Sequence, residues 1–301
     1  MGTQDEHREG LAHDLPAMQA KGMVARPRGR RSVLGLVGGV GAIALVGCGS
    51  DTSSSAGATA PGGTPPAEGA PPGGPGGQPP GGGFTADQGG LDAGDIPVET
   101  AGPFPGDGSN GVDVLSASGI VRRDIRSSFG DATGTAGGVP MRIRLTVLDN
   151  SGEDVTPYAG AAVYIWHCDR EGRYSLYSDG VTEENYLRGV QTAADDGSLE
   201  FLSVFPACYT GRWPHLHVEV YGSVDDATTA SNKLRTTQIA LPADVCGDVY
   251  DHAEGYEASR SSFAGVSLDT DGVFSDGHSL QMARLIGSID EGYTLQLRVP
   301  V

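Results

Sequence analysis

The segment that decides the fold is FPACYTGRWPHLHVEVY, residues 205–221. Its last seven residues, HLHVEVY, alternate in polarity, which is typical of a β-strand whose two faces have different surroundings. The apolar face carries Leu216, Val218 and Val220, and we expect it to point toward the core. The opposite face carries His215, His217, Glu219 and Tyr221.

Two interpretations of this polar face are open. A row of polar side chains can face solvent on an edge strand. Alternatively, His215 and His217 can converge on one metal ion, because side chains two positions apart on a strand point the same way. Tyr209 and Arg212 just upstream favour the second interpretation, as does Tyr174, which follows a predicted strand and a turn.

The two tyrosines restrict the choice of metal. A phenol is a poor ligand for zinc, magnesium or calcium at neutral pH, because its pKa is near 10. Ferric iron carries enough charge to ionise it. Phenolates from Tyr174 and Tyr209 together with one hydroxide would neutralise Fe³⁺, and neutral imidazoles of His215 and His217 would complete five ligands.

Strand patterns recur on both sides of this segment. They cover residues 141–149, 161–167, 197–205, 234–241 and 293–301. Gly- and Asp-rich turns separate them, and residues 244–260 hold the one helix that we expect. The sequence therefore predicts an all-β fold, an antiparallel β-sandwich with long loops and little helix, over residues 93–301.

The first 47 residues predict an export signal of the twin-arginine type. Arg30 and Arg31 precede an apolar stretch of 15 residues, Val33–Gly47, which is short for a membrane span. Leu45-Val46-Gly47-Cys48 matches a bacterial lipobox, so we expect lipidation of Cys48 and a place on the outer face of the cytoplasmic membrane. A plain signal anchor, or a cleaved signal without lipid, is the alternative, and the latter would give a secreted protein.

Residues 48–92 predict a disordered tether. They are rich in Gly, Pro and Ser, and they contain almost no apolar side chains that could be buried in a core. The formal net charge of −18 argues against nucleic acid or anionic lipid as a partner. Membrane contact is therefore expected only through the lipid anchor.

The pattern of tyrosines, histidines and arginine described above resembles that of the intradiol ring-cleavage dioxygenases, the family of catechol and protocatechuate 3,4-dioxygenases. The Trp-x₇-Tyr block ending at Tyr174 and the Tyr-x₅-His-x-His block from Tyr209 to His217 carry the resemblance. It extends over most of residues 100–245. The loop 222–233 and the segment from residue 246 have no counterpart that can be aligned.

The resemblance implies Fe³⁺ as the cofactor, with four ligands: Tyr174, Tyr209, His215 and His217. It implies that Tyr209 leaves the iron when substrate arrives, that Arg212 lies over the substrate ring, and that Gln238 lies near the pocket. The implied reaction cleaves a small catechol-type ring with O₂ to a cis,cis-muconate-type dicarboxylate. The alternatives are a non-catalytic extracellular binding module on the same sandwich and a zinc or copper site formed by the histidines alone.

The cysteines of the domain predict a disulfide in an oxidising compartment. Cys208 adjoins one candidate ligand, and Cys246 follows a strand that resembles one lining the same pocket. We therefore expect a Cys208–Cys246 bridge, with Cys168 as the competing partner. The oligomeric state does not follow from the sequence.

Overall fold

The computed structural model describes residues 94–301. The predicted signal peptide, the lipidation site Cys48 and the tether lie outside these residues, so export and anchoring stay predictions. Within the described part of the chain, no helix has the length and apolar character needed to cross a membrane.

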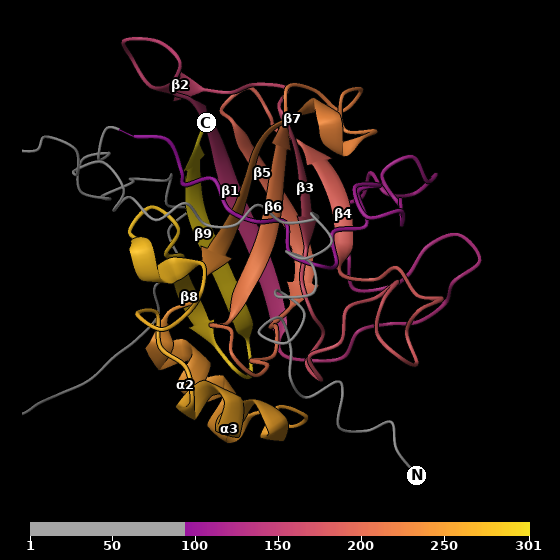
Figure 1. Ribbon diagram of the computed structural model, residues 1–301, viewed down its shortest axis with the longest axis vertical. Helices are drawn as coiled ribbons and strands as arrows, with labels where there is room; N and C mark the ends of the chain where they lie inside the picture. Colours follow the sequence, from indigo (N-terminus) through magenta and orange to yellow (C-terminus); the bar gives the residue numbers. More distant parts are fainter. Residues whose placement is uncertain (1–93) are drawn as a thin grey trace, which may run out of the picture. The chain divides into compact units, whose positions relative to one another are not determined.

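Two β-sheets form the fold (Figure 1). The first contains β1 (Pro140–Asp149), β2 (Thr156–Pro157), β5 (Ser198–Val204), β8 (Arg284–Ser288) and β9 (Gly292–Pro300). The second has the order β4-β3-β6-β7, formed by Arg188–Thr192, Ala162–Trp166, His215–Tyr221 and Lys233–Ala240. The predicted all-β class is confirmed.

One pairing differs from an antiparallel sandwich. β1 pairs with β5 and β2 in antiparallel register, but its other neighbour, β9, is parallel to it. Parallel neighbours cannot be joined by a hairpin, and here the whole second sheet lies between β1 and β9 in the sequence. The connection from β7 to β9 returns the chain to the first sheet. That connection contains α2 (Ala243–His252), α3 (Glu257–Ala264) and β8. Two helices therefore stand where one was expected.

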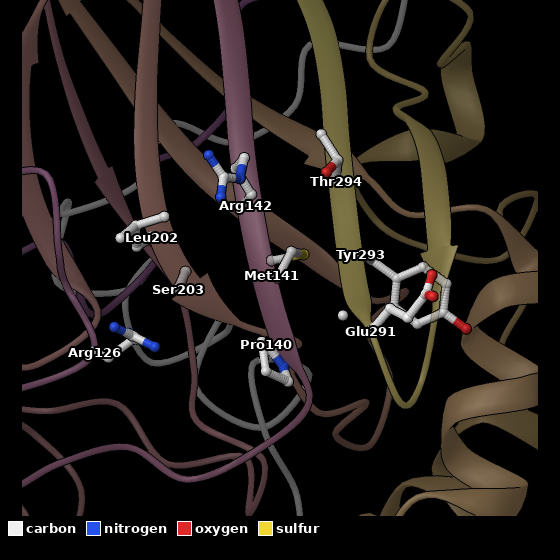
Figure 2. A pocket seen from close by; sticks show the side chains of 10 residues that line it. Arg126, Pro140, Met141, Arg142, Leu202, Ser203, Glu291, Tyr293 and Thr294 are labelled. Atoms are coloured by element: carbon white, nitrogen blue, oxygen red, sulfur yellow. The ribbon is translucent and has the colours of Figure 1, made fainter. Parts of the chain in front are cut away.

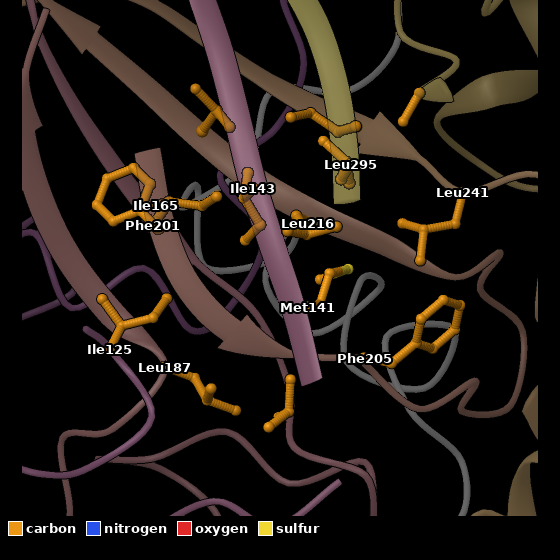
Figure 3. Close-up of a cluster of buried hydrophobic side chains, with 14 of the residues drawn as sticks. Ile125, Met141, Ile143, Ile165, Leu187, Phe201, Phe205, Leu216, Leu241 and Leu295 are labelled. Atoms are coloured by element: carbon orange, nitrogen blue, oxygen red, sulfur yellow. The ribbon is translucent and has the colours of Figure 1, made fainter. Parts of the chain in front are cut away.

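The main core lies between the two sheets and contains side chains from both (Figure 3). The alternating residues of β1 and β6 supply much of it: Met141, Ile143, Leu145, Val147, Leu216, Val218 and Val220. Leu295 of β9 joins from the C-terminal segment and is fully buried. The apolar face predicted for residues 215–221 is therefore the core face.

β6 is an inner strand, with β3 on one side and β7 on the other. All seven of its residues are buried, including the polar ones. A solvent-facing row on an edge strand is thereby excluded, and the polar face of β6 needs another explanation.

Candidate functional site

Four predicted ligands meet on the buried polar face of β6. The Tyr174 hydroxyl lies 3.3 Å from the Tyr209 hydroxyl and 3.2 Å from His217 Nε2. The Tyr209 hydroxyl lies 3.2 Å from His215 Nε2, and the two Nε2 atoms are 3.2 Å apart. The four polar atoms thus close a ring although they come from three separate segments of the chain.

The spacing of this ring fits one shared ion. Atoms bound at about 2.0–2.2 Å to the same ion lie roughly 2.8–3.6 Å from one another for angles between 90° and 110°. Hydrogen bonds have similar lengths, so the chemistry of the four groups must decide which ion they can take.

Both imidazoles are held neutral. Burial, and then the positive charge of Arg212, keeps the pKa of His215 well below its usual value. Burial and the neighbouring His215 do the same for His217. His215 Nδ1 faces the carbonyl oxygen of Trp213, which can only accept, so the ring proton belongs there. The lone pair of His215 Nε2 is then free to bind a cation.

The two phenols need a strong cation to ionise. Burial raises the pKa of Tyr209 to about 12 and that of Tyr174 further above its ordinary value. A weak Lewis acid would leave both protonated. The pair of phenols and the pair of neutral imidazoles therefore suit a highly charged ion, of which Fe³⁺ is one example.

A site formed by the histidines alone receives little support. Among residues 94–301, no group of three or more His, Cys, Asp or Glu could hold a metal ion. Catalytic zinc normally has three protein ligands, and here only two imidazoles converge without the tyrosines.

Close packing fixes the direction of His217. The ring of Trp166, its neighbour across the β3–β6 pair, stacks on it with centroids 4.8 Å apart. On another side, a Cβ atom at Gly102 would lie 3.2 Å from His217 Cε1. Gly102 also has a φ of +72°, which favours glycine. Neither Trp166 nor Gly102 had been predicted to contact the histidine.

A buried arginine supports the turn that carries Tyr174. The Arg188 guanidinium donates to the carbonyl oxygens of Phe104, Pro105 and Ser175, as well as to two hydroxyl groups. Arg188 is 1% exposed. It ties the segment before β1 to the residue following Tyr174, and no local pattern in the sequence indicates this long-range role.

Arg212 and Gln238 lie together beside the ring. Arg212 Nη2 donates to Gln238 Oε1 at 2.5 Å, and Gln238 Nε2 donates to the carbonyl oxygen of Thr100. Gln238 pairs with His217 across the β6–β7 register. The positive charge of Arg212 lowers the pKa of all four ring residues, so the guanidinium lies close to them.

The predicted disulfide is wrong, because the three cysteines of the described chain are free and buried thiols. Cys208 Sγ contacts the carbonyl oxygen of Arg212, and Cys168 Sγ contacts that of Ala207. Cys246 is fully buried in α2. Each sulfur therefore has its own packing environment instead of a bond to another.

A groove elsewhere on the molecule shares no residue with the ring (Figure 2). It lies where β1, β5 and the β8–β9 hairpin meet, and has a volume of about 360 Å³. Arg126 and Arg142 line it together with Glu291. Both arginines already pair with carboxylates, of Asp124 and Glu200 respectively, so the groove presents no free cation for a ligand.

The comparisons with known proteins find similar sequences for the segment that carries these residues. A family model described as Dioxygenase matches residues 122–224. The chlorocatechol 1,2-dioxygenase of Rhodococcus opacus is 41% identical over 69 residues, which are 23% of this chain and 26% of that protein. The chain thus spans about a quarter of that relative. These matches support the resemblance to the intradiol ring-cleavage dioxygenases that the sequence motifs predicted.

Solved structures of dioxygenases are also similar to this chain, with low sequence identity. The intradiol ring-cleavage dioxygenase of Tetranychus urticae is 22% identical, with a TM-score of 0.48, over 61% of this chain and 87% of that one. The catechol 1,2-dioxygenase of Pseudomonas arvilla C-1 is 20% identical, with a TM-score of 0.40, over 68% and 62%. The resemblance to the family rests on the sequence matches and not on these structures.

Proposed function

We propose that this chain binds Fe³⁺ through Tyr174, Tyr209, His215 and His217. With O₂, it would cleave a catechol-type ring between the two carbons that carry hydroxyl groups. The product would be a cis,cis-muconate-type dicarboxylate. The observation that carries this proposal is the closed ring of two phenols and two neutral imidazoles at 3.2–3.3 Å.

Tyr174, Tyr209, His215 and His217 would hold the ferric ion, which would supply Lewis acidity toward a catechol that chelates it. The chain's own residues would manage charge and protons around it. Tyr209 is more exposed than Tyr174 and begins the turn that ends at Arg212, so it is the phenol better suited to leave and accept a substrate proton. Tyr174 is 2% exposed and packs against Phe104, so it is the permanent anchor.

Arg212 would stabilise negative charge on the substrate oxygens. Its guanidinium is buried and fixed, which costs no reorganisation when the charge develops. A fixed cation in a site of low dielectric is also worth far more than one in water.

Two measurements on the purified, iron-loaded chain test the proposal. We expect a broad visible band from ferric phenolate and oxygen uptake with at least one member of a catechol panel. The matched control is Tyr177→Phe, which removes a nearby phenol outside the ring and should change neither. A colourless iron-loaded protein, or no oxygen uptake with any catechol, would contradict the proposal.

A further inference from the structure

Arg212 is held on two of its three nitrogens. Nε donates to Asp271 Oδ2 at 2.9 Å, and Nη2 donates to Gln238 Oε1. The side chain is 3% exposed. Its third nitrogen, Nη1, is buried and has no hydrogen-bond partner among the described residues. An unpaired buried donor costs free energy, so it is expected to have a partner in the working state.

Asp271 belongs to the C-terminal segment, 59 residues beyond Arg212. It is fully buried, and both of its oxygens are used. Oδ2 accepts from Arg212 Nε and from the Trp213 amide at 2.7 Å. Oδ1 accepts from the amides of Val273 and Phe274 at 2.8 and 3.1 Å. Four donors therefore fix this carboxylate and, through it, the guanidinium.

The same short segment also forms part of the wall of the site. The Phe274 ring lies 6.5 Å from that of His215, measured between centroids. Phe274 and Val273 pack with Trp213 in a separate apolar cluster. The position of Asp271 is therefore set by a packed unit and not by the ion pair alone.

We infer that Asp271 is a positioning residue for substrate: it fixes the Arg212 guanidinium so that Nη1 remains available to donate to an oxygen of the bound catechol. The inference rests on the proposed function and extends it to a residue outside the aligned motifs. Without the carboxylate, the long arginine side chain would recover rotamer freedom and lose its preorganised direction.

The test compares three variants in the full, iron-loaded chain: Asp271→Asn, Arg212→Gln and the double variant. Asparagine keeps the size of the side chain but removes its negative charge, and its NH₂ group can only donate, so it leaves one of the two pairs of donors around Asp271 without an acceptor. Asp269→Asn is the matched control, because Asp269 lies exposed in the same turn. The readouts are Tm, iron content, the visible band, anaerobic affinity for 4-nitrocatechol, and kcat and KM for a catechol that the wild type cleaves.

We expect Asp271→Asn to keep iron and colour but to lose about 10- to 100-fold in kcat/KM, as is usual for residues that orient a functional group. Affinity for 4-nitrocatechol should fall as well. The double variant should be no worse than Arg212→Gln, because the two residues act as one unit. Asp269→Asn should match the wild type.

Three results would overturn the inference. The first is a kcat/KM within twofold of wild type in Asp271→Asn. The second is an additive loss in the double variant. The third is a loss of activity in proportion to lost iron and a lowered Tm, which would make Asp271 a purely structural residue. If the wild type cleaves no catechol, the proposed function fails first, and that outcome is distinct from all three.

Discussion

Tyr174 and Tyr209 contribute to the same ring of polar atoms, but the fold holds them differently. The Tyr174 ring is buried and contacts Phe104 with centroids 4.9 Å apart. Tyr209 is partly exposed, and its own carbonyl oxygen accepts from the Arg212 amide in a turn. The two phenols are therefore not interchangeable, although both would supply one negative charge to Fe³⁺.

Phenylalanine at each position should separate the two roles. Tyr174→Phe should lose iron, colour and activity together, because the permanent phenolate is gone. Tyr209→Phe should retain more iron and a visible band from Tyr174, yet bind catechol slowly and turn over poorly. Iron analysis, visible spectra and rapid-mixing catechol binding check this. If both variants keep wild-type iron and spectra, neither tyrosine is a ligand.

At this scale, period two on β6 predicted that His215 and His217 lie side by side, and the chemistry of phenols limited the metal. The full set of four ligands was implied by the family resemblance. Asp271 could not be found in this way. It lies in a DTDG turn, which a single sequence does not distinguish from a surface turn. Its contact with Arg212 spans 59 residues, and only the folded chain brings the two together.

Among the strands, β4 carries the residue on which the Tyr174 turn depends. Arg188→Met should remove a donor from three carbonyl oxygens, of which, among the described residues, only that of Pro105 keeps another, the Tyr164 hydroxyl. We expect it to destabilise the protein by about 2–4 kcal/mol. Iron affinity should fall with it. Arg284→Met, on the exposed side of β8, should change the free energy of unfolding by less than about 0.5 kcal/mol. Equal urea unfolding curves for the two variants would refute this role of Arg188.

The β1–β5 pair carries a charge cluster that should make stability depend on pH. Burial alone would raise the pKa of Glu200, but hydrogen bonds from Arg144, Arg123 and Arg142 outweigh it and lower the pKa to about 2. Because the folded pKa lies below the unfolded one, the stabilisation is complete above about pH 4.5 and disappears as pH falls toward 2.

Glu200→Gln should therefore cost about 1–2 kcal/mol at pH 7, after allowance for solvent screening, and progressively less below pH 4. Urea unfolding of both proteins at pH 7 and pH 3 measures the difference. Glu153→Gln, at an exposed loop position, serves as the control and should cost nothing measurable. A cost for Glu200→Gln that is the same at both pH values would contradict the account.

The strands themselves were largely predictable. β6 occupies the predicted residues 215–221, β1 begins one residue earlier than expected, and β7 is shifted by one residue at both ends. The parallel pairing of β1 with β9 was not predictable, because alternation specifies which face is buried but not the direction of a neighbour. The second helix, α3, was missed because its sequence, EASRSSFA, is mostly polar.

For the whole molecule, the C-terminal segment is part of both the core and the site. β9 pairs with β1 along eight residues of each, and Leu295 and Val299 are fully buried. A chain that ends at Gly265 would lose β8, β9 and Asp271 together. We expect it not to fold cooperatively, which circular dichroism and thermal melting would show. A chain lacking residues 1–91 is the control and should melt like the full chain, since the predicted domain begins at residue 93.

The central claim is that the ring of Tyr174, Tyr209, His215 and His217 supports intradiol cleavage. The most direct measurement is mass spectrometry of the product that the iron-loaded full chain forms from catechol under ¹⁸O₂. The account predicts cis,cis-muconate that carries both labelled oxygen atoms, because the reaction adds one O₂ to the ring and breaks the bond between the hydroxyl-bearing carbons. A ring-opened aldehyde or a hydroxylated intact ring would contradict it, as would a failure to consume catechol and every other member of the panel.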